Sequence, residues 1–144
     1  MLFQRLNRED AEKAFLIVKN VSGATMTAGY SCIWDVSAPD GVRVTKPATA
    51  TLSLFVGIAD DDIVDQAYGL VQCYGYRASG YVINGVVTIA AGMILIPENA
   101  AWSLAYSAAS DGKTGFVYAG EAVAYVTQTT LSTAANKKVF LRAM

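Results

Sequence analysis

Apolar and polar residues alternate along several short stretches of this chain. In residues 29–36 (GYSCIWDV), every second side chain is aromatic, aliphatic or a thiol. Side chains of a β-strand point alternately to opposite faces, so a period of two indicates a strand with one face in the core. Comparable β-forming runs predict further short strands within residues 14–21, 42–45, 49–59, 69–76, 81–83, 86–89, 92–97, 102–107, 116–126 and 137–144.

Turn-forming residues separate these runs. Residues 39–41 (PDG) predict a tight turn, because proline presets φ and glycine adopts the left-handed conformation. Asn84-Gly85 is a strong hairpin signal, and residues 111–115 (DGKTG) predict a second hairpin loop. About ten short strands at intervals of 8–12 residues are typical of a β-sandwich or barrel. We therefore expect an all-β fold, a single small β-barrel or β-sandwich.

The predicted organisation is one β domain over residues 13–144. Residues 1–12 form a short N-terminal arm in this interpretation, with Asn7 able to cap one helical turn. A chain of 144 residues is long enough to fold around its own core without disulfides or metals. The sequence shows no linker, no low-complexity segment and no clean internal repeat.

Residues 78–97 pass without a charge, and twenty such residues match the length of a transmembrane helix. Glycines, the Asn84-Gly85 turn signal and many β-branched residues interrupt this tract. A lipid-facing helix would require longer apolar runs without internal turns. Two buried strands explain the tract better, and we expect no membrane partner.

Composition indicates a protein that is covered in part by a partner. Hydrophobic residues make up 53% of the chain and charged residues 16%, compared with roughly 25% charged in typical soluble domains. Exposed apolar patches tend to mark interaction sites. The net charge of −1 and the scattered basic residues give no electrostatic indication of nucleic-acid binding.

The usual parts of an enzyme are missing from the sequence. Histidine is absent, and no GxSxG or SxxK motif occurs. Cys32 and Cys73 lie among β-forming residues and are predicted to be buried thiols. A disulfide would need facing strands and an oxidising compartment, and the charged start MLFQRLNRED does not resemble a signal peptide. We expect a non-enzymatic chain made in the cytoplasm.

Two further features of the sequence have some of the residues found in ligand sites. Asp60, Asp61 and Asp62, with Asp65 nearby, form an acidic cluster without the spacing of a calcium loop, so a solvated turn is the better interpretation. Residues 75–80 (GYRASG) lack the spacing of a phosphate loop. We expect no catalytic, cofactor or metal site.

Aromatic residues on the predicted strands leave a binding function open. Such rings stack on sugars in carbohydrate-binding modules, but at alternating strand positions they more often pack in a core or line an interface rim. The set consists of Trp34, Tyr74, Tyr76, Tyr81, Trp102, Tyr106 and Tyr118.

The order of short motifs resembles the small β-barrel capsid decoration (cement) proteins and head-associated proteins of tailed bacteriophages. The segments are FLIVKNVSGATMTAGYSCIWDV, LSLFVGIADDDI, YGLVQCYGY, AAGMILIP and the closing KKVFLRAM. Matching positions are Val18, Asn20, Ser22, Gly23, Phe55, Gly57, Ile58, Ala59, Gly69, Val71, Gly75, Ala91, Gly92, Leu95 and Pro97. The resemblance covers residues 15–144, and Cys73 with the tyrosines after it departs from the pattern.

This resemblance implies a virion structural protein without a catalytic site. It would bind the outer capsid surface and bridge major capsid protein subunits, often as a trimer or dimer. The alternative is a tail or head-fibre β module that binds a host-surface glycan. The residues predicted to contact the partner are Leu2, Phe3, Arg5, Tyr74, Tyr76, Arg77 and Tyr81.

Overall fold

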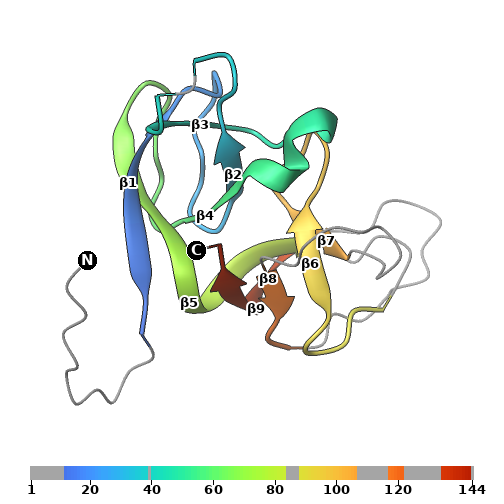
Figure 1. The fold of residues 1–144 in the computed structure, drawn as a ribbon. Helices are drawn as coiled ribbons and strands as arrows, with labels where there is room; N and C mark the ends of the chain where they lie inside the picture. The colour runs from blue at the N-terminus through green and yellow to red at the C-terminus, as the bar shows by residue number, and fades with distance from the viewer. Residues whose placement is uncertain (1–11, 39, 84–87, 107–116, 122–133, 144) are drawn as a thin grey trace.

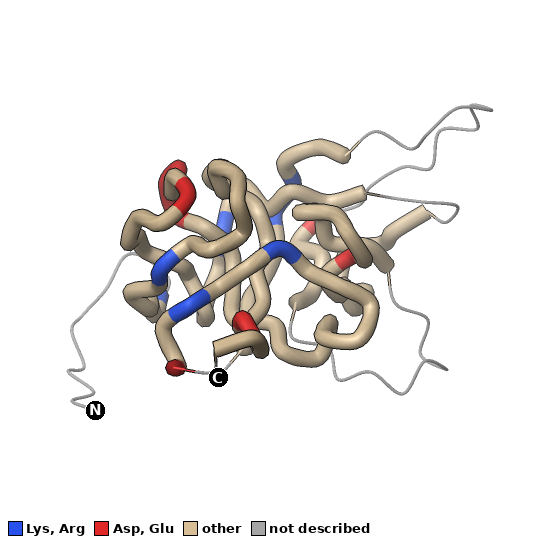
Figure 2. Tube along the Cα trace, turned by 90° about the horizontal axis from the view of Figure 1, so that it is seen from above, with Lys and Arg blue, Asp and Glu red and all other residues tan. Residues whose placement is uncertain are grey.

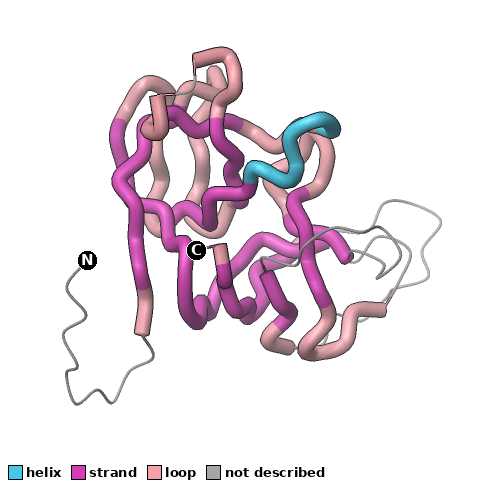
Figure 3. Tube along the Cα trace, viewed as in Figure 1, coloured by secondary structure: helices cyan, strands magenta, loops and turns pink. Residues whose placement is uncertain are grey.

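The computed structural model describes residues 12–38, 40–83, 88–106, 117–121 and 134–143. Within these ranges, nine strands form one sheet, and a single 3-10 helix precedes the fourth strand (Figure 1, Figure 3). The elements are β1 (Ala14–Asn20), β2 (Ser31–Trp34), β3 (Arg43–Thr45), η1 (Thr49–Leu54), β4 (Phe55–Ala59), β5 (Tyr68–Ile83), β6 (Ile94–Pro97), β7 (Leu104–Tyr106), β8 (Val117–Ala119) and β9 (Ala135–Arg142). The prediction of an all-β fold is therefore confirmed.

The sheet closes into two five-stranded rings that share the long strand β5. In the first ring the order is β1, β3, β2, β4, β5 and back to β1. In the second it is β5, β7, β6, β8, β9 and back to β5. Figure 1 shows β5 curving from one ring into the other. The fold is thus not one clean barrel, and every named strand has a neighbour on both sides.

The two rings have the same topology. Each contains one parallel pair, β1 with β3 and β5 with β7, and all its other pairs are antiparallel. The strand registers also correspond, because Ala59 pairs with Val71 in the first ring as Ala119 pairs with Val139 in the second. The second ring therefore repeats the first.

Backbone hydrogen bonds outside the strands repeat as well. Gly29 N–H donates to the Ala59 carbonyl at 2.9 Å, and Gly92 N–H donates to the Ala119 carbonyl at 2.7 Å. Four further backbone N–H to carbonyl bonds of the first ring have an equivalent in the second. In the first ring they run from Tyr30 to Thr27, Ala59 to Tyr30, Asp60 to Leu70 and Asp35 to Arg43. Their equivalents in the second ring, in the same order, run from Met93 to Ala90, Ala119 to Met93, Gly120 to Lys138 and Glu98 to Ser103.

A tight turn with an Ala-Gly sequence begins the second strand of each ring. Gly29 has φ +92° and Gly92 has φ +87°, a conformation that glycine adopts without steric cost. Met26 and Ile89, both fully buried, occupy equivalent positions ahead of these turns. Local sequence thus directs the chain into the same turn twice.

The buried residues form two hydrophobic cores, one mainly within each ring, and β4 contributes to both. The first core consists of Val18, Met26, Cys32, Val44, Val56, Ala59, Ile63 and Val71. The second consists of Phe55, Ile58, Val82, Ile89, Leu95, Leu104, Val117, Ala119, Val139 and Leu141. Residues at equivalent positions, such as Val44 and Leu104, are both buried although their side chains differ in size.

The repeat is not recognisable in the sequence because the number of residues between equivalent positions varies. Cys32 corresponds to Leu95 and Val44 to Leu104, so the distance between equivalents changes from strand to strand. Few identities remain beyond the Ala-Gly turns. Burial and register are conserved between the rings where residue type is not.

Some predicted elements differ in detail from the structure. Residues 49–54 form η1 instead of strand, because the N–H and hydroxyl of Thr51 both bond to the Ala48 carbonyl and hold a local turn. The runs 69–76 and 81–83 join into the single strand β5. The predicted turns at Asn84-Gly85 and 111–115 and the helical turn at Asn7 lie outside the described residues.

Within the described ranges, no helix is long and apolar enough to span a membrane. Much of the uncharged tract instead contributes to strands, with β5 at its start and β6 at its end. Charged residues are sparse along the chain and of mixed sign (Figure 2).

Candidate docking face

The outer surface of the β1–β5 pair is apolar. Ile17 lies directly opposite Leu70, and paired residues of antiparallel strands point to the same face of a sheet. Their neighbours Val18 and Val71 point inward and are fully buried. Ile17 is 70% exposed, an unusual degree of solvent contact for an isoleucine in the middle of a strand.

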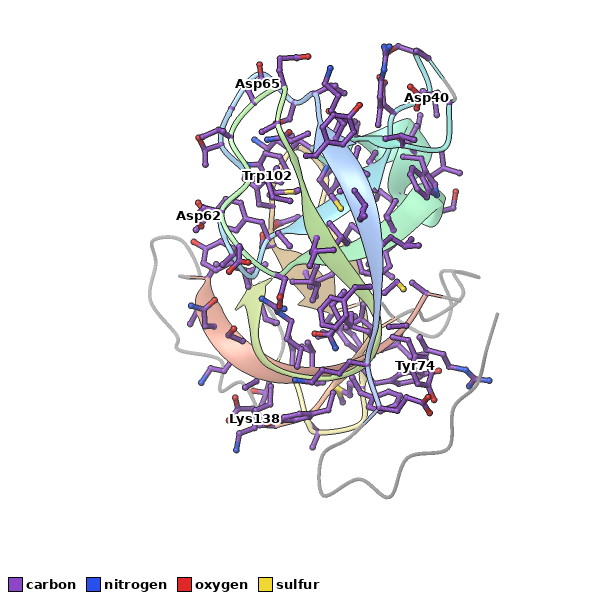
Figure 4. The ribbon with its side chains drawn as sticks, turned by 90° about the vertical axis from the view of Figure 1, so that its left-hand side faces the viewer. Asp40, Asp62, Asp65, Tyr74, Trp102 and Lys138 are labelled. Carbon is purple, nitrogen blue, oxygen red and sulfur yellow. The ribbon has the colours of Figure 1, made fainter. Side chains whose placement is uncertain are left out.

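The exposed apolar surface extends along both strands. Phe15 lies opposite Gln72, and Tyr68, 66% exposed, lies opposite Lys19. At the lower end of the β1–β5 pair, near the middle of β5, Tyr74 makes an edge contact with Phe140 of β9, with ring centroids 5.8 Å apart. In Figure 4, which looks onto β1 and β5, Tyr74 marks this lower end and Asp65 the opposite end.

Aromatic side chains also line up across three strands of the second ring. Phe140 of β9 pairs with Tyr76 of β5 on one side and with Tyr118 of β8 on the other. We use the name apolar face for the exposed residues Phe15, Ile17, Tyr68, Leu70, Tyr76 and Phe140 together with the half-buried Tyr74.

A buried amide holds the aromatic end of this face. The Gln72 side-chain NH₂ donates to the carbonyls of Tyr74 and Tyr76, each at 3.1 Å. Gln72 itself is almost fully buried. The backbone that presents the two tyrosines is therefore fixed by hydrogen bonds, which lowers the ordering cost of binding.

Positively charged residues border the apolar face. Lys19 stands opposite Tyr68 at the upper end, and Arg142 stands opposite Tyr74 at the lower end. Lys13 precedes β1 and is exposed, with Glu12 beside it. In the described part of the chain, ion pairs within 4.0 Å join only Arg43 to Asp40 and Arg77 to Asp60. Among the described residues, the border thus carries a net positive charge that no ion pair offsets.

Arg77 has an internal role. Its guanidinium is 7% exposed and donates to the Asp60 carboxylate at 2.8 Å, to the Ala59 carbonyl at 2.7 Å and to the Ser79 carbonyl at 2.8 Å. A weaker bond reaches the Gln72 amide oxygen at 3.4 Å. These bonds tie the end of β4 to β5, so Arg77 is not part of the apolar face.

Tyr81 belongs to a second aromatic group at the junction of the rings. Tyr30 stacks on Trp102 with centroids 5.4 Å apart, and Tyr81 lies 5.2 Å from Tyr30. The Lys46 ammonium lies 5.9 Å from the Trp102 ring centroid. The three aromatic side chains cover one another, and none is more than half exposed. They therefore pack the first five-stranded ring against the second.

The acidic cluster stabilises the loop before β5. Asp62 accepts the Ala28 N–H at 2.8 Å, and Asp65 accepts the Gly23 N–H at 2.9 Å. Among the described residues, no group of three His, Cys, Asp or Glu side chains could hold a metal ion. These carboxylates connect loops of the first ring.

A depression of about 530 Å³ lies beside β2 and β3, between Trp34, Val36 and Leu54. Arg43 on its wall is paired with Asp40 at 2.9 Å. The backbone N–H groups of Val42 and Arg43 lower the pKa of Asp40. Arg43 and Asp40 at this depression are thus already paired with each other.

Both cysteines are free and buried, as predicted. Burial raises the pKa of the Cys32 thiol to about 12, an effect that hydrogen bonding with the Gly57 backbone partly offsets. Burial also raises the pKa of Cys73. Neither thiol is poised to ionise near neutral pH.

Of the seven residues predicted from the sequence to contact a partner, the structure brings together Tyr74 and Tyr76. Arg77 and Tyr81 lie elsewhere, and Leu2, Phe3 and Arg5 lie outside the described residues. The prediction missed Ile17 and Leu70. A signal was available, because residues 14–18 (AFLIV) are apolar at every position, whereas a half-buried strand alternates.

No protein-family model and no curated protein sequence matches this chain. The arrangement of residues must therefore carry the functional argument.

Proposed function

We propose that this protein is a non-enzymatic structural component of a virus particle. It binds the outer surface of the capsid and bridges neighbouring major capsid protein subunits. The observation that carries this proposal is the apolar face, since contiguous exposed apolar surface marks sites of protein association. The order of motifs that resembles phage decoration proteins supports the choice of partner.

The closed rings favour docking through side chains. An unpaired strand edge can recruit another chain by backbone hydrogen bonds, and closure of a sheet removes such edges. Both sides of every described strand are occupied here. Binding would then depend on the apolar area buried, about 25 cal/mol per Å² before association costs, summed over many symmetric copies.

Glycan binding by a fibre module is the competing hypothesis. It needs an aromatic ring whose face is open to a sugar. Tyr30 and Trp102 instead stack on each other with 18° between their planes. This contact occupies the Tyr30 and Trp102 pair, whereas Tyr68 and Tyr76 are exposed on the apolar face, so the two hypotheses are separated by experiment.

The test is addition of purified protein to capsid shells that were assembled without it. The proposal expects saturable binding at a fixed ratio of copies to shell subunits, and shells that resist heat better when occupied. A glycan array serves as the parallel measurement. Glycan binding without any shell binding would reject the proposal.

A further inference from the structure

The second ring offers an internal comparison for the apolar face. Register equivalence places Lys138 where the first ring has Leu70, and Asn136 where it has Tyr68. Opposite Lys138, Ala78 and Ser79 form a bulge between Arg77 and Gly80 where the first ring has the single residue Ile17. The same scaffold therefore tolerates polar side chains at these positions, and the fold does not require apolar ones.

The charged residues around the apolar face indicate what kind of protein surface it binds. Lys13, Lys19 and Arg142 surround the apolar centre and make no ion pair within the described part of the chain. Interfaces commonly combine an apolar centre rich in aromatic residues with a polar rim. Electrostatic complementarity across such a rim sets specificity and association rate.

We propose that the apolar face is the docking surface, and that it binds a protein surface with an apolar centre bordered by carboxylates. The identity of that partner as the capsid shell rests on the proposed function. Phe15, Ile17 and Leu70 enter the partner's apolar centre, with the tyrosines at its margin. Lys19 and Arg142 face carboxylates at opposite ends.

The first test transfers the polar residues of the second ring onto the first. The double variant Ile17→Ser, Leu70→Lys changes two exposed side chains and should fold like the wild type, as checked by circular dichroism and thermal melting. Binding to assembled shells is expected to weaken about 100-fold, because central apolar contacts carry most of the binding energy. Val64→Ser is the matched control, since Val64 is also apolar and 57% exposed but lies outside the face. It should change affinity by less than about twofold.

The second test reverses the border charges. Lys19→Glu with Arg142→Glu is expected to weaken shell binding about tenfold, mainly by slowing association, and wild-type affinity should fall as salt is raised. Binding that is indifferent to both changes would overturn the carboxylate-bordered partner.

The outcomes separate the two proposals. If wild-type protein does not bind shells, the proposed function fails, and with it this partner. If wild type and the Ile17→Ser, Leu70→Lys variant bind shells equally, the docking face is wrong while the proposed function stands. If sedimentation shows that free wild-type protein self-associates and the variant does not, a second copy occupies the face instead of the shell.

Discussion

The two rings have one architecture and different outer surfaces. Each has the same strand order, the same parallel pair and the same Ala-Gly turn, and each buries its own core. Outside, the first ring presents Leu70 and Tyr68 where the second presents Lys138 and Asn136, and it has Ile17 where the second has the Ala78-Ser79 bulge. Hydrogen-bond geometry and burial thus define the scaffold, while the exposed positions are free to acquire a function.

Shared use of β5 predicts that the rings unfold together. Met26→Ala in the first ring and Ile89→Ala in the second remove equivalent, fully buried side chains. Each should lower the free energy of unfolding by about 2–5 kcal/mol through lost burial and a residual cavity. Urea denaturation followed by circular dichroism and tryptophan fluorescence should show one shifted transition in both variants. Two separate transitions would show that the rings are independent.

Arg77 should matter far more than an exposed arginine. Arg77→Met leaves the Asp60 carboxylate without its donor and removes one of the two hydrogen bonds to the Ala59 carbonyl, and we expect a loss of about 2–4 kcal/mol in unfolding free energy. Arg43→Met removes a solvent-exposed pair with Asp40 and should cost about 0–1 kcal/mol. Chemical denaturation of the two variants tests the difference, and equal losses would refute the internal role of Arg77.

The equivalent glycines should differ in their tolerance of a side chain. A Cβ at Gly92 would meet nothing within 4 Å, so Gly92→Ala should cost only backbone strain, about 1 kcal/mol. A Cβ at Gly29 would lie 3.2 Å from the Asn136 amide oxygen and 3.3 Å from the Ser79 carbonyl, and we expect about 2 kcal/mol. Thermal melts that rank the two variants in the opposite order would contradict the placement of Gly29 against the second ring.

A further expected effect appears only at alkaline pH. The folded-state pKa of Cys32, about 12, lies above its ordinary value of 9.0. Burial of the neutral thiol therefore contributes full stability below about pH 9, and this contribution declines as pH rises toward 12. Leu95, its equivalent in the second ring, does not titrate. Cys32→Val should lose less stability than wild type over this pH window in urea titrations, and parallel curves would argue against the buried thiol.

Much of the fold was predictable from alternation and turn chemistry, because the strands at 14–20, 31–34 and 43–45 follow local patterns. The repeat of the two rings was not predictable, since strand pairing depends on register between segments that are distant in sequence. Of the candidate face, Tyr74 and Tyr76 were identified. Arg77 was misplaced although it alternates with Tyr76 along β5, because a charged side chain is usually exposed and its partners Asp60 and Ala59 come from a strand end that is distant in sequence.

The measurement that most directly tests the docking face is hydrogen exchange of the protein bound to assembled shells, compared with the free protein. Our account predicts added protection in residues 14–20 and 68–74, with little change in β6 and β7. Protection confined to the second ring, with unchanged exchange in β1 and the first half of β5, would contradict it.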